Sequence, residues 1–225
     1  YIKNLSIFNL IMSVFDLNKD HKINVECFMN SNIYYINDFY KDPGAVVNFL
    51  KDHPPNIHAP EAPMGDASVN GIQFFDYRHT MHLDEVEPVY SYLSNICGQK
   101  RKYKHDLLMT NKTKFILNSF NDYKNNYWHP HKDFGYTALI YLNKNDNECG
   151  TNLYRSIVPD IHNQLGEHVT PWRSKSKWSI IKTLEPKYNQ CVIFDGLKFN
   201  HGMSIPNEKY FGDEYRLNQV FFFGN

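Results

Sequence analysis

The sequence has little of several features that assign a function at once. Acidic and basic residues number 24 each, so the formal net charge is zero and no overall field draws the chain to nucleic acid or an anionic membrane. The four cysteines are scattered, without C-x-x-C spacing or a dense disulfide framework, which is typical of reduced thiols. The apolar segment 5–15 is too short to cross a bilayer. We therefore expect a cytoplasmic protein with no membrane partner and no nucleic-acid partner.

A chain of 225 residues is most simply one domain with a single core. Residues 1–30 differ from the rest and predict an N-terminal appendage before a domain at 31–225. Alternating polar residues from Asp16 to Asn24 are similar to a calcium-binding loop, but His21 stands at the glycine position and Cys27 at the final glutamate position. A polar turn is the better interpretation of this stretch.

Two helices and a long loop are predicted before residue 100. Ile33–Ile36 is β-branched and aromatic and predicts a strand, and Asp42-Pro43 predicts the start of a helix with aspartate as its cap. Apolar residues recur every three or four positions between Val86 and Cys97, which predicts an amphipathic helix that ends near Gly98. The proline- and glycine-rich stretch 53–71 predicts a loop and is a candidate for substrate contact.

From residue 107 onward, short β-rich runs alternate with polar turns, which is typical of a sandwich or barrel. The fold class expected is therefore mainly β with flanking helices. The predicted strands are residues 114–120, 137–142, 178–184, 190–194 and 217–223.

The candidate chemistry is concentrated between Tyr127 and Asp133, in the order Y-W-H-P-H-K-D. His131 and Asp133 are two residues apart, so on an extended strand both side chains project from one face and can hold one cation. His201 is the candidate third ligand, because two histidines and one carboxylate form the facial triad of non-heme Fe(II) oxygenases. His129 forms H-x-H with His131 but brings no carboxylate, so it is placed in the wall of the site.

Other histidines are weaker candidates for metal ligands. His79 and His82 could share one face of a helix, yet no third ligand is evident near them. His162 and His168 lie in a polar, turn-rich stretch and are interpreted as loop residues.

The motifs that follow Asp133 occur in a recognisable order. They are Tyr141-Leu142-Asn143, Cys149-Gly150-Thr151, His201 and Arg216. As an ordered set over residues 125–225 they resemble the 2-oxoglutarate/Fe(II)-dependent oxygenases, and in particular the prolyl-4-hydroxylase-like branch, whose pattern runs H-x-D, Y-L-N, G-G-T, a distal histidine, then arginine or lysine. The first glycine of G-G-T is replaced here by Cys149. The resemblance implies a double-stranded β-helix of the jelly-roll, cupin-like type.

The resemblance also implies the cofactors and their residues. Fe(II) would be held by His131, Asp133 and His201, with 2-oxoglutarate and O₂ as cosubstrates and ascorbate in support. Arg216 matches the position that binds the far carboxylate of 2-oxoglutarate; Arg155 and Lys182 are its substitutes, because a polar insertion lengthens the spacing from His201. Tyr141 matches a phenol that holds the same carboxylate, and Tyr127 is a further candidate for contact with the cosubstrate or for the barrel wall.

The branch implies hydroxylation of an unactivated C–H bond in a prolyl or other peptidyl residue. Trp128, His129 and Lys132 are the candidate substrate contacts. A free amino acid or small metabolite is the alternative substrate, and a cupin-like binding module without turnover is the alternative of a different class.

Overall fold

The structure, a computed structural model, describes residues 13–52, 67–69, 72–77, 83–99, 108–115, 120–144, 148–158, 172–211 and 216–224. The chain is mainly β with few helices, which confirms the expected class. The largest sheet has eight strands, in the order β1 (Ile23–Phe28), β2 (Ser31–Ile36), β11 (Cys191–Asp195), β7 (Tyr136–Tyr141), β13 (Arg216–Phe223), β5 (Leu108–Phe115), β4 (Ile72–Tyr77) and β3 (Ala67–Val69). A smaller sheet has the order β10 (Trp178–Leu184), β8 (Thr151–Ser156) and β12 (Asn200–Met203), and β6 (Asn126–Trp128) pairs with β9 (Trp172–Ser174).

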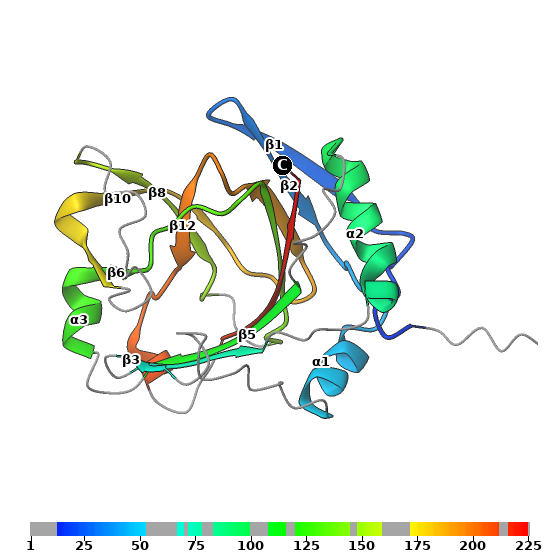
Figure 1. The fold of residues 1–225 in the computed structure, drawn as a ribbon, viewed down its shortest axis with the longest axis horizontal. Coiled ribbons are helices and arrows are strands. Elements are labelled where there is room, and N and C mark those ends of the chain that lie inside the picture. Colours follow the sequence, from blue (N-terminus) through cyan, green and yellow to red (C-terminus); the bar gives the residue numbers. More distant parts are fainter. Residues whose placement is uncertain are drawn as a thin grey trace, which may run out of the picture.

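The large sheet separates two hydrophobic clusters, because successive side chains of a strand point to opposite faces. On β7, Ala138 and Ile140 pack with the helices, whereas Leu139 and Tyr141 pack with Leu153 of the smaller sheet. We call the first side the outer face of the large sheet and the second its inner face. Figure 1 shows the resulting layers, with α1 (Pro43–Asp52) and α2 (Leu83–Cys97) on one side and β8, β10 and β12 on the other. A third helix, α3 (Phe120–Asn125), precedes β6.

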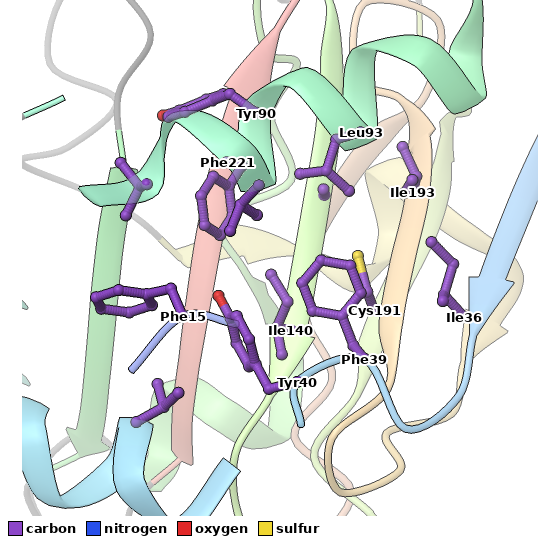
Figure 2. Packing of buried hydrophobic residues seen from close by; sticks show 14 of the residues in the cluster. Phe15, Ile36, Phe39, Tyr40, Tyr90, Leu93, Ile140, Cys191, Ile193 and Phe221 are labelled. Carbon is purple, nitrogen blue, oxygen red and sulfur yellow. The ribbon is translucent and has the colours of Figure 1, made fainter. Parts of the chain in front are cut away.

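The helix α1 begins, and the helix α2 ends, where the sequence predicts. The Asp42 carboxylate accepts a hydrogen bond from the Ala45 amide at 2.9 Å, and Pro43 is the first residue of α1. Gly98 has a φ of 63° after α2, where its amide and that of the next residue bond back to carbonyls of the last turn. Figure 2 shows Tyr90 and Leu93 of α2 over the strands, and the Tyr90 ring packs edge-on against Phe221 at 5.0 Å. The helices therefore cover the outer face, whereas the inner face packs against the smaller sheet.

Residues 13–30, which the sequence predicts as part of an N-terminal appendage, pair and pack with the segments that follow. Phe15 is 2% exposed and packs edge-on against Tyr40 and Phe49 in the outer cluster. The whole of β1 pairs with β2, and the hairpin turn between them, Met29-Asn30, has positive φ at both residues. A boundary at residue 30 would cut this hairpin.

One predicted strand has different bounds in the structure. The apolar run 114–120 predicts a single strand, but β5 ends at Phe115 and α3 begins at Phe120. The middle of β5, from Thr110 to Lys114, is polar and is strand because β5 pairs with both β13 and β4. Of the predicted loop 53–71, the structure describes only β3, and the rest lies outside the described residues. In the described part of the chain, no helix has both the length and the apolar character that a membrane span requires.

Candidate metal centre

His131 and His201 face each other across a single antiparallel bridge. The His131 amide donates to the His201 carbonyl at 3.0 Å, and the His201 amide donates back to the His131 carbonyl at 2.8 Å. Directly opposed residues of an antiparallel pair project from the same face, so the two imidazoles are neighbours, with ring centroids 4.4 Å apart. The backbone therefore brings together two residues that are seventy positions apart.

Asp133 completes the group. Its amide donates to the Gly196 carbonyl at 3.0 Å, and its carboxylate lies 3.0 Å from His201 Nε2 and 3.5 Å from His131 Nε2. One ligand atom from each of the three residues lies within 4.8 Å of the others. We call His131, Asp133 and His201 the metal triad; the structure brings together the three residues that the sequence predicts.

Backbone carbonyls orient both imidazoles. His131 Nδ1 lies 2.7 Å from the His129 carbonyl oxygen, and His201 Nδ1 lies 3.2 Å from the Phe199 carbonyl oxygen. A carbonyl only accepts, so each Nδ1 carries a proton, which leaves Nε2, the nitrogen on the side of Asp133, as the atom that can bind a metal. Carbonyl acceptors of this kind fix the ligating tautomer of histidines in metal sites.

The Asp133 carboxylate is held in its ionised form. Burial by itself raises the pKa of this carboxyl, but the neighbouring His201 and His131 outweigh burial and hold the pKa well below its usual range. Thr137 Oγ1 donates to Asp133 Oδ2 at 2.6 Å, which further fixes the carboxylate. A deprotonated carboxylate is the form that binds a metal.

Replacing Thr137 by valine is expected to lower the affinity for Fe(II) about tenfold, because Asp133 loses the donor that orients it. The measurement is an anaerobic metal titration. Thr183→Val is the matched control, because Thr183 Oγ1 donates to Asn152 on the smaller sheet, away from the triad. Equal loss of affinity in both variants would contradict a specific role for Thr137.

The triad is open on one side. The side chain of His201 is 6% exposed and that of Asp133 is 11% exposed, whereas that of His131 is 28% exposed. Three donor groups are fewer than a transition metal accepts, so a metal held by these residues would keep further coordination positions for small molecules.

A second polar group lies on the inner face. Arg216 is 7% exposed; its Nε donates to the Cys149 carbonyl at 3.0 Å and its Nη2 to Thr151 Oγ1 at 3.2 Å. The guanidinium also lies over the Tyr141 ring at 5.6 Å, and the Tyr141 hydroxyl donates to the same Thr151 oxygen at 3.0 Å. Burial raises the pKa of Tyr141, which opposes its ionisation. We call Arg216, Tyr141 and Thr151 the anion site.

Within the described residues, no carboxylate forms an ion pair with Arg216. A buried cation without a counter-ion costs free energy, so the anion site is suited to a negatively charged ligand. Neither predicted substitute takes this position. Lys182 is already paired with Glu26 at 2.8 Å, and Arg155 is exposed and contacts Met29.

Strand register relates the metal triad to the anion site. Both Thr137, which contacts Asp133, and Tyr141 lie on β7, four residues apart, or about 13 Å along the strand. On the facing sheet His201 pairs with Leu153, and Thr151 is two residues further, about 7 Å away. Leu139 and Leu153 form the apolar stretch between the two polar ends.

Tyr127 is not brought together with the anion site. Its ring packs on Tyr154 at 4.9 Å, and Lys175 lies 5.5 Å from its centroid. Tyr154 alternates along β8 with Leu153, so its side chain lies on the opposite face of the smaller sheet from Thr151. Of the two predicted roles for Tyr127, the structure favours packing within the protein over contact with a cosubstrate.

The three residues predicted to contact the substrate lie in different surroundings, and of these only His129 packs against a residue of the metal triad in the described contacts. His129 stacks on the His131 ring at 4.3 Å with an interplanar angle of 16°, so it lines the triad. Trp128 instead packs edge-on against Trp172 at 5.3 Å, in a separate cluster with Met203. Lys132 is half-buried and lies in the chain between two ligands. The histidines at 79, 82, 162 and 168 lie outside the described residues.

Gly202 is a residue of the site that sequence reasoning missed. A Cβ added there would lie 2.3 Å from the Trp128 carbonyl oxygen, so only glycine allows the strand with His201 to approach the segment with His131. The motif N-H-G-M was the available signal. Thr137 was also missed, because it lies in no recognisable pattern of its own, and Thr151 was noted in Cys149-Gly150-Thr151 without a predicted role in the site.

Gly202→Ala is therefore expected to separate the two halves of the triad. Overpacking of this kind typically costs about 1–3 kcal/mol, and we expect a chain that still folds but binds Fe(II) at least tenfold more weakly. Thermal unfolding and metal titration of the same sample measure the two effects. An alanine variant with unchanged metal affinity would contradict this role.

A comparison of the sequence with models of protein families and with curated proteins finds no match. The assignment of a function consequently rests on the geometry of the metal triad and the anion site.

Proposed function

We propose that the chain is an Fe(II)/2-oxoglutarate-dependent dioxygenase that hydroxylates an unactivated C–H bond. The observation that carries the proposal is the pairing of an open His-Asp-His triad with a buried arginine that has no carboxylate partner in the described residues. A ligand with a carboxylate at one end and a metal-chelating group at the other satisfies both sites at once. 2-Oxoglutarate has this constitution.

The triad fits ferrous iron by its donor set. Two imidazole nitrogens and one carboxylate on one face form the set used by non-heme Fe(II) oxygenases, and both imidazoles present the ligating Nε2. Bound there, Fe(II) supplies the redox chemistry that joins O₂ activation to decarboxylation of 2-oxoglutarate. In the overall reaction, R–H, 2-oxoglutarate and O₂ give R–OH, succinate and CO₂.

The residues of the chain position the reactants. His131, Asp133 and His201 would hold the metal, and Arg216 would hold the far carboxylate of the cosubstrate bidentately, as a planar guanidinium does best. The Tyr141 hydroxyl lies within the same group through Thr151. The apolar stretch of Leu139 and Leu153 would exclude water from the middle of the ligand.

The finer fold proposed with this function is a double-stranded β-helix. Two facing sheets with a core between them, and a metal triad where β12 meets the segment after β6, support it. The order of the motifs along the chain supports the prolyl-4-hydroxylase-like branch.

We further propose a prolyl or other peptidyl residue as the substrate. Phe134, next to Asp133, is 86% exposed, and Leu197 is 51% exposed on the neighbouring loop, where its amide donates to the Gly135 carbonyl. Exposed apolar side chains beside a catalytic site suit a polypeptide better than a small polar metabolite. A screen of proline-containing peptides against free amino acids distinguishes these substrates.

The test is succinate formation by the purified protein with Fe(II), ascorbate, O₂ and 2-oxoglutarate. The proposal predicts slow succinate release without a second substrate and faster release with the right peptide. If the wild-type chain takes up no iron and forms no succinate, the result favours a cupin-like binding module instead.

A further inference from the structure

Asn218 is a buried amide that the protein leaves without hydrogen bonds. Its side chain is 0% exposed, and within the described residues neither Oδ1 nor Nδ2 has a partner. A buried amide without partners costs free energy, and most buried polar groups in proteins are paired. The position therefore needs an explanation beyond the stability of the fold.

Strand alternation places this amide on the inner face. Leu217 and Phe221 of β13 pack in the outer cluster, whereas Val220 packs in the inner one. Asn218 shares the face of Val220 and of Arg216, two residues before it. In the register of the sheet, Asn218 is directly opposite Tyr141. The unpartnered amide is thus a neighbour of the anion site.

The other face of the same strand provides a contrast. Gln219, also 0% exposed, accepts a hydrogen bond at Oε1 from the Tyr40 hydroxyl at 2.9 Å, while its Nε2 has no partner among the described residues. On the outer face one polar atom of the buried amide therefore has a protein partner, whereas on the inner face neither polar atom of Asn218 has one in the described residues. This difference indicates that the partner of Asn218 is a ligand.

We propose that Asn218 is a binding residue for the carboxylate that the anion site receives, with its Nδ2 donating to a lone pair of a carboxylate oxygen that the Arg216 guanidinium does not use. This inference rests on the proposed function, since it takes 2-oxoglutarate as the ligand. Such a donor adds selectivity for a dicarboxylate over a monocarboxylate 2-oxo acid, because the amide is left unpaired when no far carboxylate is present.

The experiment compares variants of the full chain loaded with Mn(II), which holds the ligand without turnover. Asn218→Leu keeps the shape of the side chain and removes its hydrogen-bonding atoms. We expect its affinity for 2-oxoglutarate to fall about 10- to 100-fold in calorimetric titration, because a hydrogen bond to a charged group is lost. The Tm of the ligand-free variant should be unchanged or higher, because an unpaired polar group has been removed.

Two further variants separate binding from folding. Asn218→Asp places a carboxylate beside Arg216 and is expected to lower the affinity by more than 100-fold without loss of Tm, since it competes for the guanidinium. Gln219→Met is the matched control; it removes the bond from Tyr40 and should lower the Tm while the affinity stays as in the wild type.

The outcomes are distinguishable. Wild-type affinity in Asn218→Leu, with loss of affinity in Arg216→Met, would overturn the role of Asn218 and leave the proposed function intact. A marked loss of Tm in Asn218→Leu would overturn it too, because the amide would then stabilise the fold itself. Absence of 2-oxoglutarate binding in the Mn(II)-loaded wild type would overturn the proposed function together with this inference.

Discussion

Replacing Asp133 by alanine is expected to abolish succinate formation and to weaken Fe(II) binding at least about 100-fold. The carboxylate lies within 3.5 Å of both ligating imidazole nitrogens, so its loss removes one of three ligands and the only charged one. Inductively coupled plasma analysis after dialysis measures retained iron, and a succinate assay measures turnover.

Two controls make the result specific to the metal triad. Asp20→Ala removes an exposed carboxylate from the turn before β1 and should leave both readouts unchanged. Asp133→Asn keeps the shape and one oxygen, so it should retain the fold and still lose most of the iron. An Asp133→Ala protein that kept a full equivalent of iron would contradict the assignment of the triad.

Arg216→Met is expected to raise the KM for 2-oxoglutarate about 100-fold while iron binding is preserved. Methionine keeps part of the apolar stem but offers no charge to a carboxylate, and truncating a charged contact of this kind costs about 2–5 kcal/mol. Because Arg216 bonds only Cys149 and Thr151 among the described residues, and has no counter-ion there, the fold should tolerate the change.

The dependence of the rate on 2-oxoglutarate concentration measures this effect. Arg155→Met is the matched control, since Arg155 is exposed and lies next to the C-terminal end of β8. An unchanged KM in Arg216→Met would contradict the anion site, and an equal rise in both variants would indicate a general effect of lost charge.

Two residues of the metal triad were predictable because they are two positions apart in the sequence, and the third because it follows them in a recognisable order of motifs. H-x-D fixes two ligands on one extended segment, and the distal histidine follows from the motif order. The carbonyl acceptors of His129 and Phe199 could not be predicted, because they depend on backbone geometry. His129 adopts a φ of 44°, and this positive backbone angle cannot be predicted from the presence of a histidine at this position.

The fold was predictable where a strand or helix carries its own periodicity. The strand 178–184 has the predicted bounds because it is rich in aromatic and β-branched residues, and α2 ends at Cys97 as predicted because its apolar residues recur every three or four positions. β1 was missed because Ile23 and Val25 are exposed, so the strand depends on pairing with β2 and not on burial. Asn218 was missed for a similar reason, because only the register of β13 shows which face it occupies.

Reciprocal binding of Fe(II) and 2-oxoglutarate tests the central claim most directly. Under anaerobic conditions, we expect one equivalent of Fe(II) per chain, bound more tightly when 2-oxoglutarate is present, and 2-oxoglutarate bound more tightly by the same factor when Fe(II) is present. Both effects should vanish in Asp133→Ala. Iron and 2-oxoglutarate that bind independently, or a wild-type chain that takes up no iron, would contradict the account.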